Sequence, residues 1–578
     1  MWPRDYGDVV MRKGFDNEYD FIIVGAGSAG CVLANRLSEN PQWKILLLEA
    51  GGDPPIESMI PRLAFSFFKT KYDWQYYAEI SDTVSQYSPK GSYWARGKVL
   101  GGSSAMNSLV YSRGNEDDYN NWERLGNPTW GWKDVLPYFK KSEANRNFEG
   151  YYHSKDGLLS VEFFNSSNPL SQDIIAAAEE LGYKFLLDMN AKKHVGFTLA
   201  QGTLKSGLRN SAASAFLIPA MNRPNLHIVK HAHVTKLEID SQGTVSGVSM
   251  KLRGQTEFKA FAKKEVILSA GAINSPQILM LSGIGPASHL QEMKIPVIQS
   301  LQVGKNLQDH PYIPLFLKMD KSTAVAVTVA DLVQSYYQYL AQHAGIFANS
   351  GTVEAIGFVN SQDMFARYPD IQYYHIGFQK GQALDIMGFL QNLGYNDVVI
   401  NTAASASNDA NIIILPVALL NENSRGEILL RNADPMQKPK IYPNYLREES
   451  DIQSFLRAIR LYLKFLGTEA YKMHETELFS IPIPECDAQG FNSDAYWTCY
   501  IRYMISTVFH PCGTNKMGPD SDPGSVVDYR LRVKGTTGLR VIDASIMPRI
   551  PRGNLNAPTI MIAEKGSDFI KNDLGFLI

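Results

Sequence analysis

Residues 19–51 carry the feature that most constrains this chain: a strand, a glycine turn, a helix and a second strand in direct succession. The first strand, residues 21–24, is an unbroken apolar run, typical of a parallel strand covered on both faces. The turn after it has glycine at its first, third and sixth positions. We expect Gly25 to allow the tight bend, Gly27 to let the backbone approach a pyrophosphate, and Gly30 to let the helix pack on the strand. The start of that helix would point free N–H groups at the phosphates.

Glu49 follows the second strand, residues 44–48, and lies 24 positions after Gly25. A carboxylate at this place accepts hydrogen bonds from the ribose of an adenosine and would repel a 2′-phosphate. A GxGxxG turn by itself is a weak signal, because it often marks an ordinary tight turn. Together with its strand, its helix and the spaced acid, it predicts a site for a dinucleotide other than NADP.

Composition and charge exclude several other classes of protein. The 578 residues are enough for two or more domains, and 44% hydrophobic with 20% charged residues is typical of soluble globular proteins. The net charge is −2 and no charge block occurs, so we expect no nucleic-acid partner. The longest apolar run, residues 412–420, contains a proline and is too short to cross a bilayer. We therefore expect a buried strand there and no membrane span.

A second glycine-rich segment, residues 96–107, lies far from the first along the chain. Backbone amides in such a loop can bind another part of a ligand that is too long for one phosphate cradle, and FAD is such a ligand. Near the C-terminus, residues 539–542 form a further apolar strand, which we expect to complete the nucleotide-binding sheet. Asp543 then lies at the strand end where open α/β sheets bind ligands.

With these segments the chain resembles the glucose-methanol-choline (GMC) family of FAD-dependent oxidoreductases, and most closely its arthropod members. The resemblance covers nearly the whole length, and it rests on residues 25–30 with Glu49, 96–114, 269–285, 303–310 and 509–559. It implies an α/β fold with a Rossmann-like FAD-binding domain and a second, substrate-binding domain built on an antiparallel sheet flanked by helices. The expected FAD-binding domain comprises residues 1–160, 205–315 and 506–578, and the substrate-binding domain comprises 161–204 and 316–505.

The resemblance also assigns the cofactor site. Val234 is expected to give backbone contacts to the adenine. Some family members carry a histidine that bonds covalently to the flavin, and Met106 stands at that position here, so we expect non-covalent FAD. We expect no metal site, since none of the four cysteines has metal spacing. The expected FAD contacts are Gly25, Gly27, Ser28, Ala29, Gly30, Glu49, Ala50, Arg96, Val99, Gly101, Gly102, Ser103, Asn107, Val234, Asp543, Ala544 and Asn554.

Two residues near the C-terminus are expected to be catalytic. Oxidation of an unactivated alcohol needs a base for the hydroxyl proton and a polar group that holds the oxygen. His510 lies in a His-Pro-x-Gly-Thr block that matches the base of the family, although most of the eleven histidines in a chain like this are structural. Asn554 matches the family's second site, and an amide can donate to the oxygen but cannot act as the base. Hydride would pass from the substrate carbon to flavin N5.

The leading interpretation is an alcohol oxidase that uses O2 and releases H2O2. The alternatives are a dehydrogenase with a quinone acceptor and a redox-neutral hydroxynitrile lyase. A binding protein with an inactive site is disfavoured while the turn glycines, His510 and Asn554 are all present. Aromatic residues of the substrate region favour a small aromatic or apolar alcohol, a cyanohydrin included, unless they only fill the core. They are Tyr336, Tyr337, Phe347, Phe358, Tyr373, Tyr374 and Phe378.

The cysteines and the N-terminus bear on localisation. Cys486 and Cys499 lie in a Pro/Asp/Gly-containing stretch that allows a disulfide, and the alternative is free thiols in a cytosolic protein. The resemblance favours the disulfide and a secreted protein. Residues 1–6 contain no apolar segment of a signal peptide, so we expect such a peptide to have been removed. Asn165 begins an Asn-Ser-Ser glycosylation sequon, which is compatible with secretion.

Overall fold

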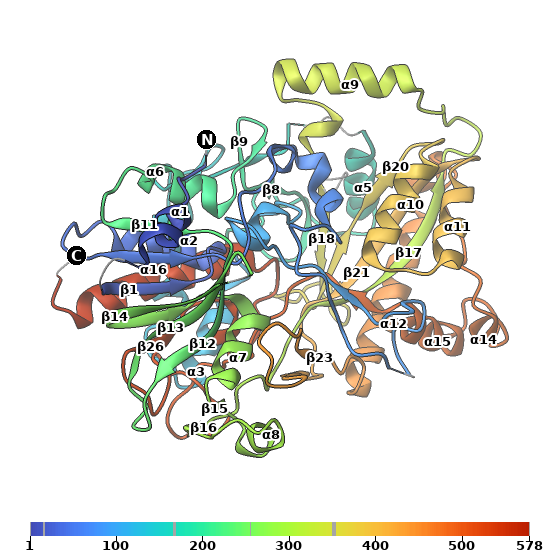
Figure 1. Cartoon of the computed structure of the whole chain (residues 1–578). Coiled ribbons are helices and arrows are strands. Elements are labelled where there is room, and N and C mark those ends of the chain that lie inside the picture. Colours follow the sequence, from blue (N-terminus) through green and yellow to red (C-terminus); the bar gives the residue numbers. More distant parts are fainter. Residues whose placement is uncertain are drawn as a thin grey trace.

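Two large sheets lie side by side in the computed structural model (Figure 1). It describes residues 2–15, 18–81, 83–165, 169–254, 256–349 and 354–576. Both sheets are assembled from strands that lie far apart in the sequence.

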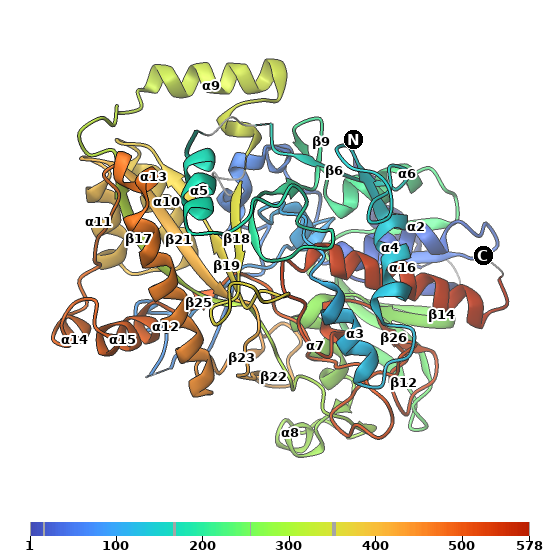
Figure 2. The ribbon, with the colours of Figure 1, turned by 180° about the vertical axis from the view of Figure 1, so that it is seen from behind.

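The first sheet is parallel at its centre, with β14 between β1 and β26. Residues 21–24 of β1 are buried, as expected for a parallel strand with both faces covered. On one side, α16 (Asn556–Asp573) packs on α2 (Ser28–Leu37) and on α4 (Trp132–Ser142) (Figure 2). The parallel strands, in spatial order, are β11 (Leu226–Val229), β2 (Ile45–Leu48), β1 (Tyr19–Val24), β14 (Thr256–Leu268) and β26 (Leu539–Val541).

The two halves of strand β14 pair with different strands. Its residues 265–268 pair parallel with β1, whereas residues 256–261 pair antiparallel with β13 (Val245–Leu252). A hairpin joins β13 to β12 (Ala232–Ile239), with its turn at residues 240–243. The first sheet thus continues into a three-stranded meander, and this meander brings β12 into contact with the parallel strand β2.

The second sheet is antiparallel throughout and carries helices on both faces. In Figures 1 and 2, α10 (Ala383–Leu393) and α11 (Asp397–Ala406) lie on one face, and α5 (Pro169–Glu180) and α12 (Glu449–Leu463) on the other. The expected fold class is confirmed. The strand order is β24 (Glu477–Leu478), β17 (Pro311–Met319), β21 (Asn411–Leu419), β19 (Ile371–Tyr374), β18 (Ala355–Val359) and β7 (Gly196–Leu199); β20 (Ile376–Phe378) also pairs with β21, and β25 (Ser506–Thr507) with β17.

The expected domain boundaries cut across this second sheet. They place residues 311–315 and 506–507 in the FAD-binding domain, whereas β17 and β25 pair with each other in the second sheet. We propose that both strands belong to the substrate-binding domain. The other expected domain boundaries stay proposals.

A disulfide joins Cys486 to Cys499, as expected, and it links α14 (Pro484–Asp487) to α15 (Asp494–Met504). Cys31 and Cys512 are buried thiols. Asn165 is exposed, but the two serines of its sequon lie outside the described residues. Among the helices that the structure describes, none has the length and apolar character that a bilayer crossing needs.

Candidate active site

The two glycine-rich segments lie against each other. A Cβ on Gly102, where φ is +52°, would be 2.7 Å from the Cα of Gly27. Beside this contact, the backbone N–H of Gly101 donates to the carbonyl oxygen of Ala26 over 2.7 Å. Because a real Cβ never approaches another atom so closely, the approach of the two loops requires the absence of a side chain at Gly102.

The other two turn glycines are needed for backbone packing. Gly25 has φ +97°, and a Cβ there would lie 2.6 Å from the carbonyl oxygen of Ser269. A Cβ on Gly30 would lie only 1.8 Å from the carbonyl oxygen of Gly25. Any side chain at Gly30 would therefore push α2 away from the turn that it follows.

A cavity of about 1080 Å³, the first cavity, lies over this contact at the carboxyl ends of the parallel strands. Most of the residues expected to bind FAD line it. Gly30, Val99 and Gly101 stand behind the lining, and Asn107 and Asn554 line a neighbouring cavity instead. Those that line the first cavity are Gly25, Gly27, Ser28, Ala29, Glu49, Ala50, Arg96, Gly102, Ser103, Val234, Asp543 and Ala544.

Two buried carboxyl groups hold the loops around the first cavity. Glu49 accepts from the backbone N–H of Ala26 over 2.9 Å and from that of Gly51 over 2.8 Å, and burial raises the pKa of Glu49 to about 7. Asp543 accepts from the backbone N–H of Gly271 over 2.8 Å and from the hydroxyl of Ser275 over 2.6 Å. Burial also raises the pKa of Asp543.

The neighbouring cavity, the second cavity, has a volume of about 800 Å³. Ser28, Arg96 and Ser103 line both cavities, so the two cavities adjoin. The second cavity contains His510 and Asn554, the two residues expected to be catalytic.

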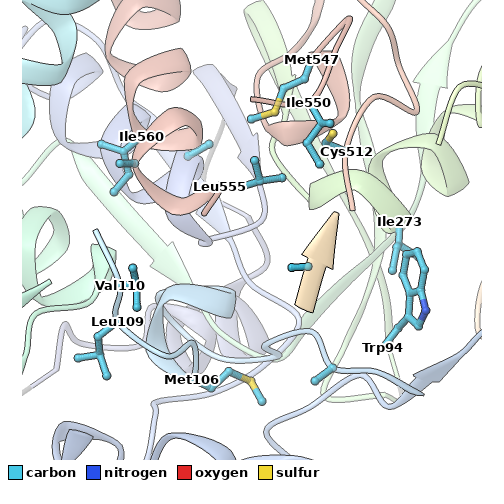
Figure 3. Close-up of a cluster of buried hydrophobic side chains, with 14 of the residues drawn as sticks. Trp94, Met106, Leu109, Val110, Ile273, Cys512, Met547, Ile550, Leu555 and Ile560 are labelled. Atoms are coloured by element: carbon cyan, nitrogen blue, oxygen red, sulfur yellow. The ribbon is translucent and has the colours of Figure 1, made fainter. Parts of the chain in front are cut away.

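The residues that are present fit FAD in these two cavities. A Cβ on Gly27 would meet nothing closer than 4.0 Å, so the backbone of the first loop lies open to a phosphate at the start of α2. Met106 lines the second cavity with a buried thioether among Leu109, Val110 and Leu555 (Figure 3). A thioether has no ring nitrogen with which to form the covalent flavin bond of some relatives.

The hydrogen bonds of His510 assign its tautomer. Its Nε2 lies 3.3 Å from Nδ2 of Asn554, and an amide nitrogen can only donate. Nε2 therefore carries the lone pair, and the proton of the neutral ring is on Nδ1. That N–H points to Nδ1 of His310, 3.0 Å away, which accepts. The acceptor nitrogen of His510 thus faces the second cavity beside a donor.

The surroundings keep His510 neutral and fixed in place. Burial, with smaller contributions from His310 and Arg96, lowers its pKa well below the usual value, although part of the ring faces the second cavity. Its backbone N–H donates to Asp309 over 2.8 Å, and Arg96 donates to the carbonyl oxygen of Phe509 over 2.6 Å. Phe509 has φ +66°, a strained conformation for a non-glycine residue that these bonds maintain.

A smaller apolar cavity of about 510 Å³ adjoins the second cavity, and both are lined by Asn554 and Phe509. Tyr374 lines the apolar cavity and donates to Oδ1 of Asn554 over 3.4 Å. The other residues of this lining are mostly apolar: Phe65, Ser108, Tyr312, Ile376, Phe389, Leu393, Pro416, Thr507 and Val508.

The lining of the apolar cavity differs from the expected set of aromatic residues. Tyr374 belongs to both, but Tyr336 and Tyr337 are 42% and 66% exposed on α9 (Val329–Gln342). Phe358 and Tyr373 are buried in the second sheet. These residues do not line the apolar cavity, and the two buried rings fill the core of the second sheet, which was the alternative; the sequence does not tell which face of an element a ring occupies.

Several residues of the site are given no role by the sequence patterns discussed above. His310 contacts His510, and Phe65 and Phe389 line the apolar cavity. For His310 a signal was available: the segment 303–310 contains a glycine and ends in two polar residues, Asp309 and His310. Phe65 and Phe389 give no such signal, because they meet only in the folded chain.

Comparison with known proteins identifies the family. Residues 19–312 match the N-terminal domain and residues 422–563 the C-terminal domain described as GMC oxidoreductase. The chain is 40% identical to the Drosophila melanogaster protein named glucose dehydrogenase [FAD, quinone], over 98% of this chain and 88% of that protein. It is 35% identical to ecdysone oxidase of Bombyx mori, over 99% of this chain and 83% of that one.

Among solved structures, pyridoxine 4-oxidase from Mesorbium loti superposes with a TM-score of 0.80 at 27% sequence identity, over 95% of this chain and 99% of that one. The expected recognition of the family, and with it FAD as the cofactor, is confirmed. The chain therefore belongs to the GMC oxidoreductase family and is an FAD-dependent enzyme that acts on CH–OH groups.

Proposed function

We propose that this enzyme oxidises a small apolar or aromatic alcohol, cyanohydrins included, to the carbonyl compound. The observation that carries the proposal is the position of Nε2 of His510 and Nδ2 of Asn554, 3.3 Å apart where the second cavity meets the apolar cavity. An acceptor and a donor are thus presented together to one hydroxyl group.

In the proposed reaction, the hydroxyl oxygen of the substrate accepts from Nδ2 of Asn554 and its proton moves to Nε2 of His510. Bound FAD supplies the acceptor for the hydride on the adjacent carbon. The N–H on Nδ1 of His510 stays hydrogen-bonded to His310, so the ring keeps its orientation when it becomes charged. The oxygen stays held by Asn554, whose other amide atom is fixed by Tyr374.

The substrate class follows from the apolar cavity. Its lining places aromatic and aliphatic side chains around the space that the carbon skeleton would occupy. A sugar would bury several hydroxyl groups there with few partners, which costs free energy for each unmade hydrogen bond. An aromatic ring in contact with Phe65 and Phe389 carries no such cost.

For the electron acceptor we propose O2, with H2O2 as the second product. A quinone is the second candidate, and the 40% identity to the Drosophila protein named glucose dehydrogenase [FAD, quinone] favours it. Measuring oxygen consumption against reduction of a quinone-like dye with the same alcohol separates the two. Dye reduction without oxygen uptake would exclude the oxidase.

The role of His510 is tested with His510→Ala. We expect the rate of anaerobic flavin bleaching by benzyl alcohol to fall by about 10²- to 10⁴-fold, with FAD content unchanged. His343→Ala is the matched control, because His343 caps α9, outside the lining of these cavities. A variant that keeps most of its bleaching rate would contradict the base assignment. Cleavage of a cyanohydrin without any bleaching would instead indicate the redox-neutral lyase.

A further inference from the structure

A cavity of about 1280 Å³ with both polar and apolar residues in its wall, the outer chamber, lies beneath α9. Gln338 of α9 and Ile346 line it and are themselves exposed, so the outer chamber reaches the surface of the protein. Amide side chains, among them Gln379, Gln382 and Asn411, form much of its wall. The wall of the outer chamber is therefore more polar than that of the apolar cavity.

The outer chamber and the apolar cavity adjoin along two elements that line both. The short helix η2 (Pro61–Phe67) gives Arg62 to the outer chamber and Phe65 to the apolar cavity. Strand β20 gives Phe378 to the outer chamber and Ile376 to the apolar cavity. A molecule that occupied both spaces would therefore contact η2 and β20 in each of them.

Three aromatic rings stand between the two spaces. The ring of Phe389 lies 5.3 Å from that of Phe65 and 5.8 Å from that of Phe378, measured between centroids. Phe65 and Phe389 line the apolar cavity, and Phe378 lines the outer chamber. The three rings thus form an aromatic constriction between the two spaces, and a molecule that reached both would have to place apolar atoms against them.

Arg62 is the charged group of the outer chamber that lacks a partner. Among the described residues it forms no hydrogen bond and no ion pair; Asp385 attracts it only at longer range, and burial lowers the pKa of its guanidinium. The two acids of the same wall have partners of their own, because His474 contacts Asp173 over 3.2 Å and Asp320 over 2.6 Å, and Nδ2 of Asn411 donates to Asp320 over 2.8 Å. A partly buried guanidinium without an anion is costly, and a carboxylate is its best partner.

We propose that the outer chamber binds a carboxylate at the far end of the alcohol substrate, with Arg62 as the residue that selects it. This inference rests on the proposed function. The preferred substrates are then hydroxy acids with an apolar body: the alcohol reaches Asn554 and His510, the body passes the aromatic constriction, and the carboxylate pairs with Arg62.

The test uses the FAD-loaded enzyme and ω-[4-(hydroxymethyl)phenyl]alkanoic acids of increasing chain length, each with its methyl ester. We expect kcat/KM to pass through a maximum with chain length, and at that length the acid to exceed its ester by about tenfold or more. In Arg62→Gln this preference should disappear while kcat/KM for benzyl alcohol stays unchanged. Arg62→Lys keeps the charge and should retain part of the preference.

Arg447→Gln is the matched control, since Arg447 is an exposed arginine whose side chain lines a different cavity. Equal kcat/KM for acids and esters in the unchanged enzyme, or a preference that survives Arg62→Gln, would overturn the inference. If the unchanged enzyme and the variants oxidise benzyl alcohol, the proposed function holds whether or not the preference for acids is found. Absence of turnover with every alcohol would overturn the proposed function instead.

Discussion

His310 and His510 face each other through their Nδ1 atoms, 3.0 Å apart, with their ring planes at 86°. His310 is fully buried, and burial lowers its pKa to about 3, so it is a neutral acceptor. Because it accepts the N–H of His510, it holds the opposite nitrogen of His510 in the basic form. We infer that His310 is a positioning residue for the proposed base.

Replacing His310 by alanine removes that acceptor. We expect kcat/KM for benzyl alcohol to fall roughly tenfold to a hundredfold. Loss of the acceptor of the Nδ1 N–H should also change the pKa of His510, so in His310→Ala the acidic limb of the pH profile of kcat/KM should move. A variant with reduced activity and an unmoved acidic limb would indicate a packing role only. The measurement is the pH dependence of kcat/KM at constant FAD content.

The contact between Gly27 and Gly102 predicts a loss of cofactor in Gly102→Ala. The added methyl group would lie 2.7 Å from the Cα of Gly27, and φ at +52° strains any residue with a side chain. We expect the affinity for FAD to weaken by about tenfold or more. Gly388→Ala in α10 is the control, since its added Cβ would meet nothing within 4 Å. Unchanged flavin absorbance per chain in Gly102→Ala would contradict the proposed cradle.

Met106 predicts that FAD is released when the protein unfolds. Precipitation with acid, followed by centrifugation, should leave the yellow colour in the supernatant and a colourless pellet. Colour that stays with the pellet would show a covalent bond from another residue. The absorbance of the supernatant against total flavin before precipitation gives the released fraction.

A buried ion network predicts a stability that declines with rising pH. His153 contacts Glu143 over 3.0 Å and Asp188 over 2.8 Å. Burial by itself would lower the pKa of His153, but hydrogen bonds to Asp188 and Glu143 outweigh it and raise the pKa above 6.5. Since the folded protein binds this proton more tightly than the unfolded chain, the stabilisation is complete below pH 6.5 and is lost as pH rises through the raised pKa.

The loss should appear as a fall of about 1 °C in apparent Tm for each kcal/mol, since ~2.1 cal/mol/K per residue gives an unfolding entropy of about 1.2 kcal/mol/K for 578 residues. His153→Gln should have a lower Tm at acidic pH and should lack this step. Thermal melts at a series of pH values check both. If the fall of Tm with rising pH is unchanged in His153→Gln, other titrating groups cause it.

The sequence predicts those parts of the site that are local in the chain. The turn at residues 25–30 and its strand and helix were recognisable, because each glycine has a backbone reason to be there. The expected strand at residues 539–542 is found as β26, beside β14. The FAD-binding and catalytic roles of individual residues stay proposals.

Contacts between distant segments could not be predicted in this way. Phe65 and Phe389 are 324 positions apart and adjoin in the apolar cavity only because η2 packs near α10. Tyr336 and Tyr337 carry the same kind of side chain and lie on the surface of α9. Which aromatic residue reaches a substrate depends on how two domains come together, and this information is not in any short pattern.

The pairing of β26 with β14 also has a consequence for biosynthesis. Gly25 and Ala544 are 519 positions apart along the chain, yet both line the first cavity. A nascent chain lacks that wall until residues 539–544 have emerged and β26 has paired. We therefore expect flavin loading to wait for these residues, and a chain that stops shortly before residue 539 to be colourless and inactive.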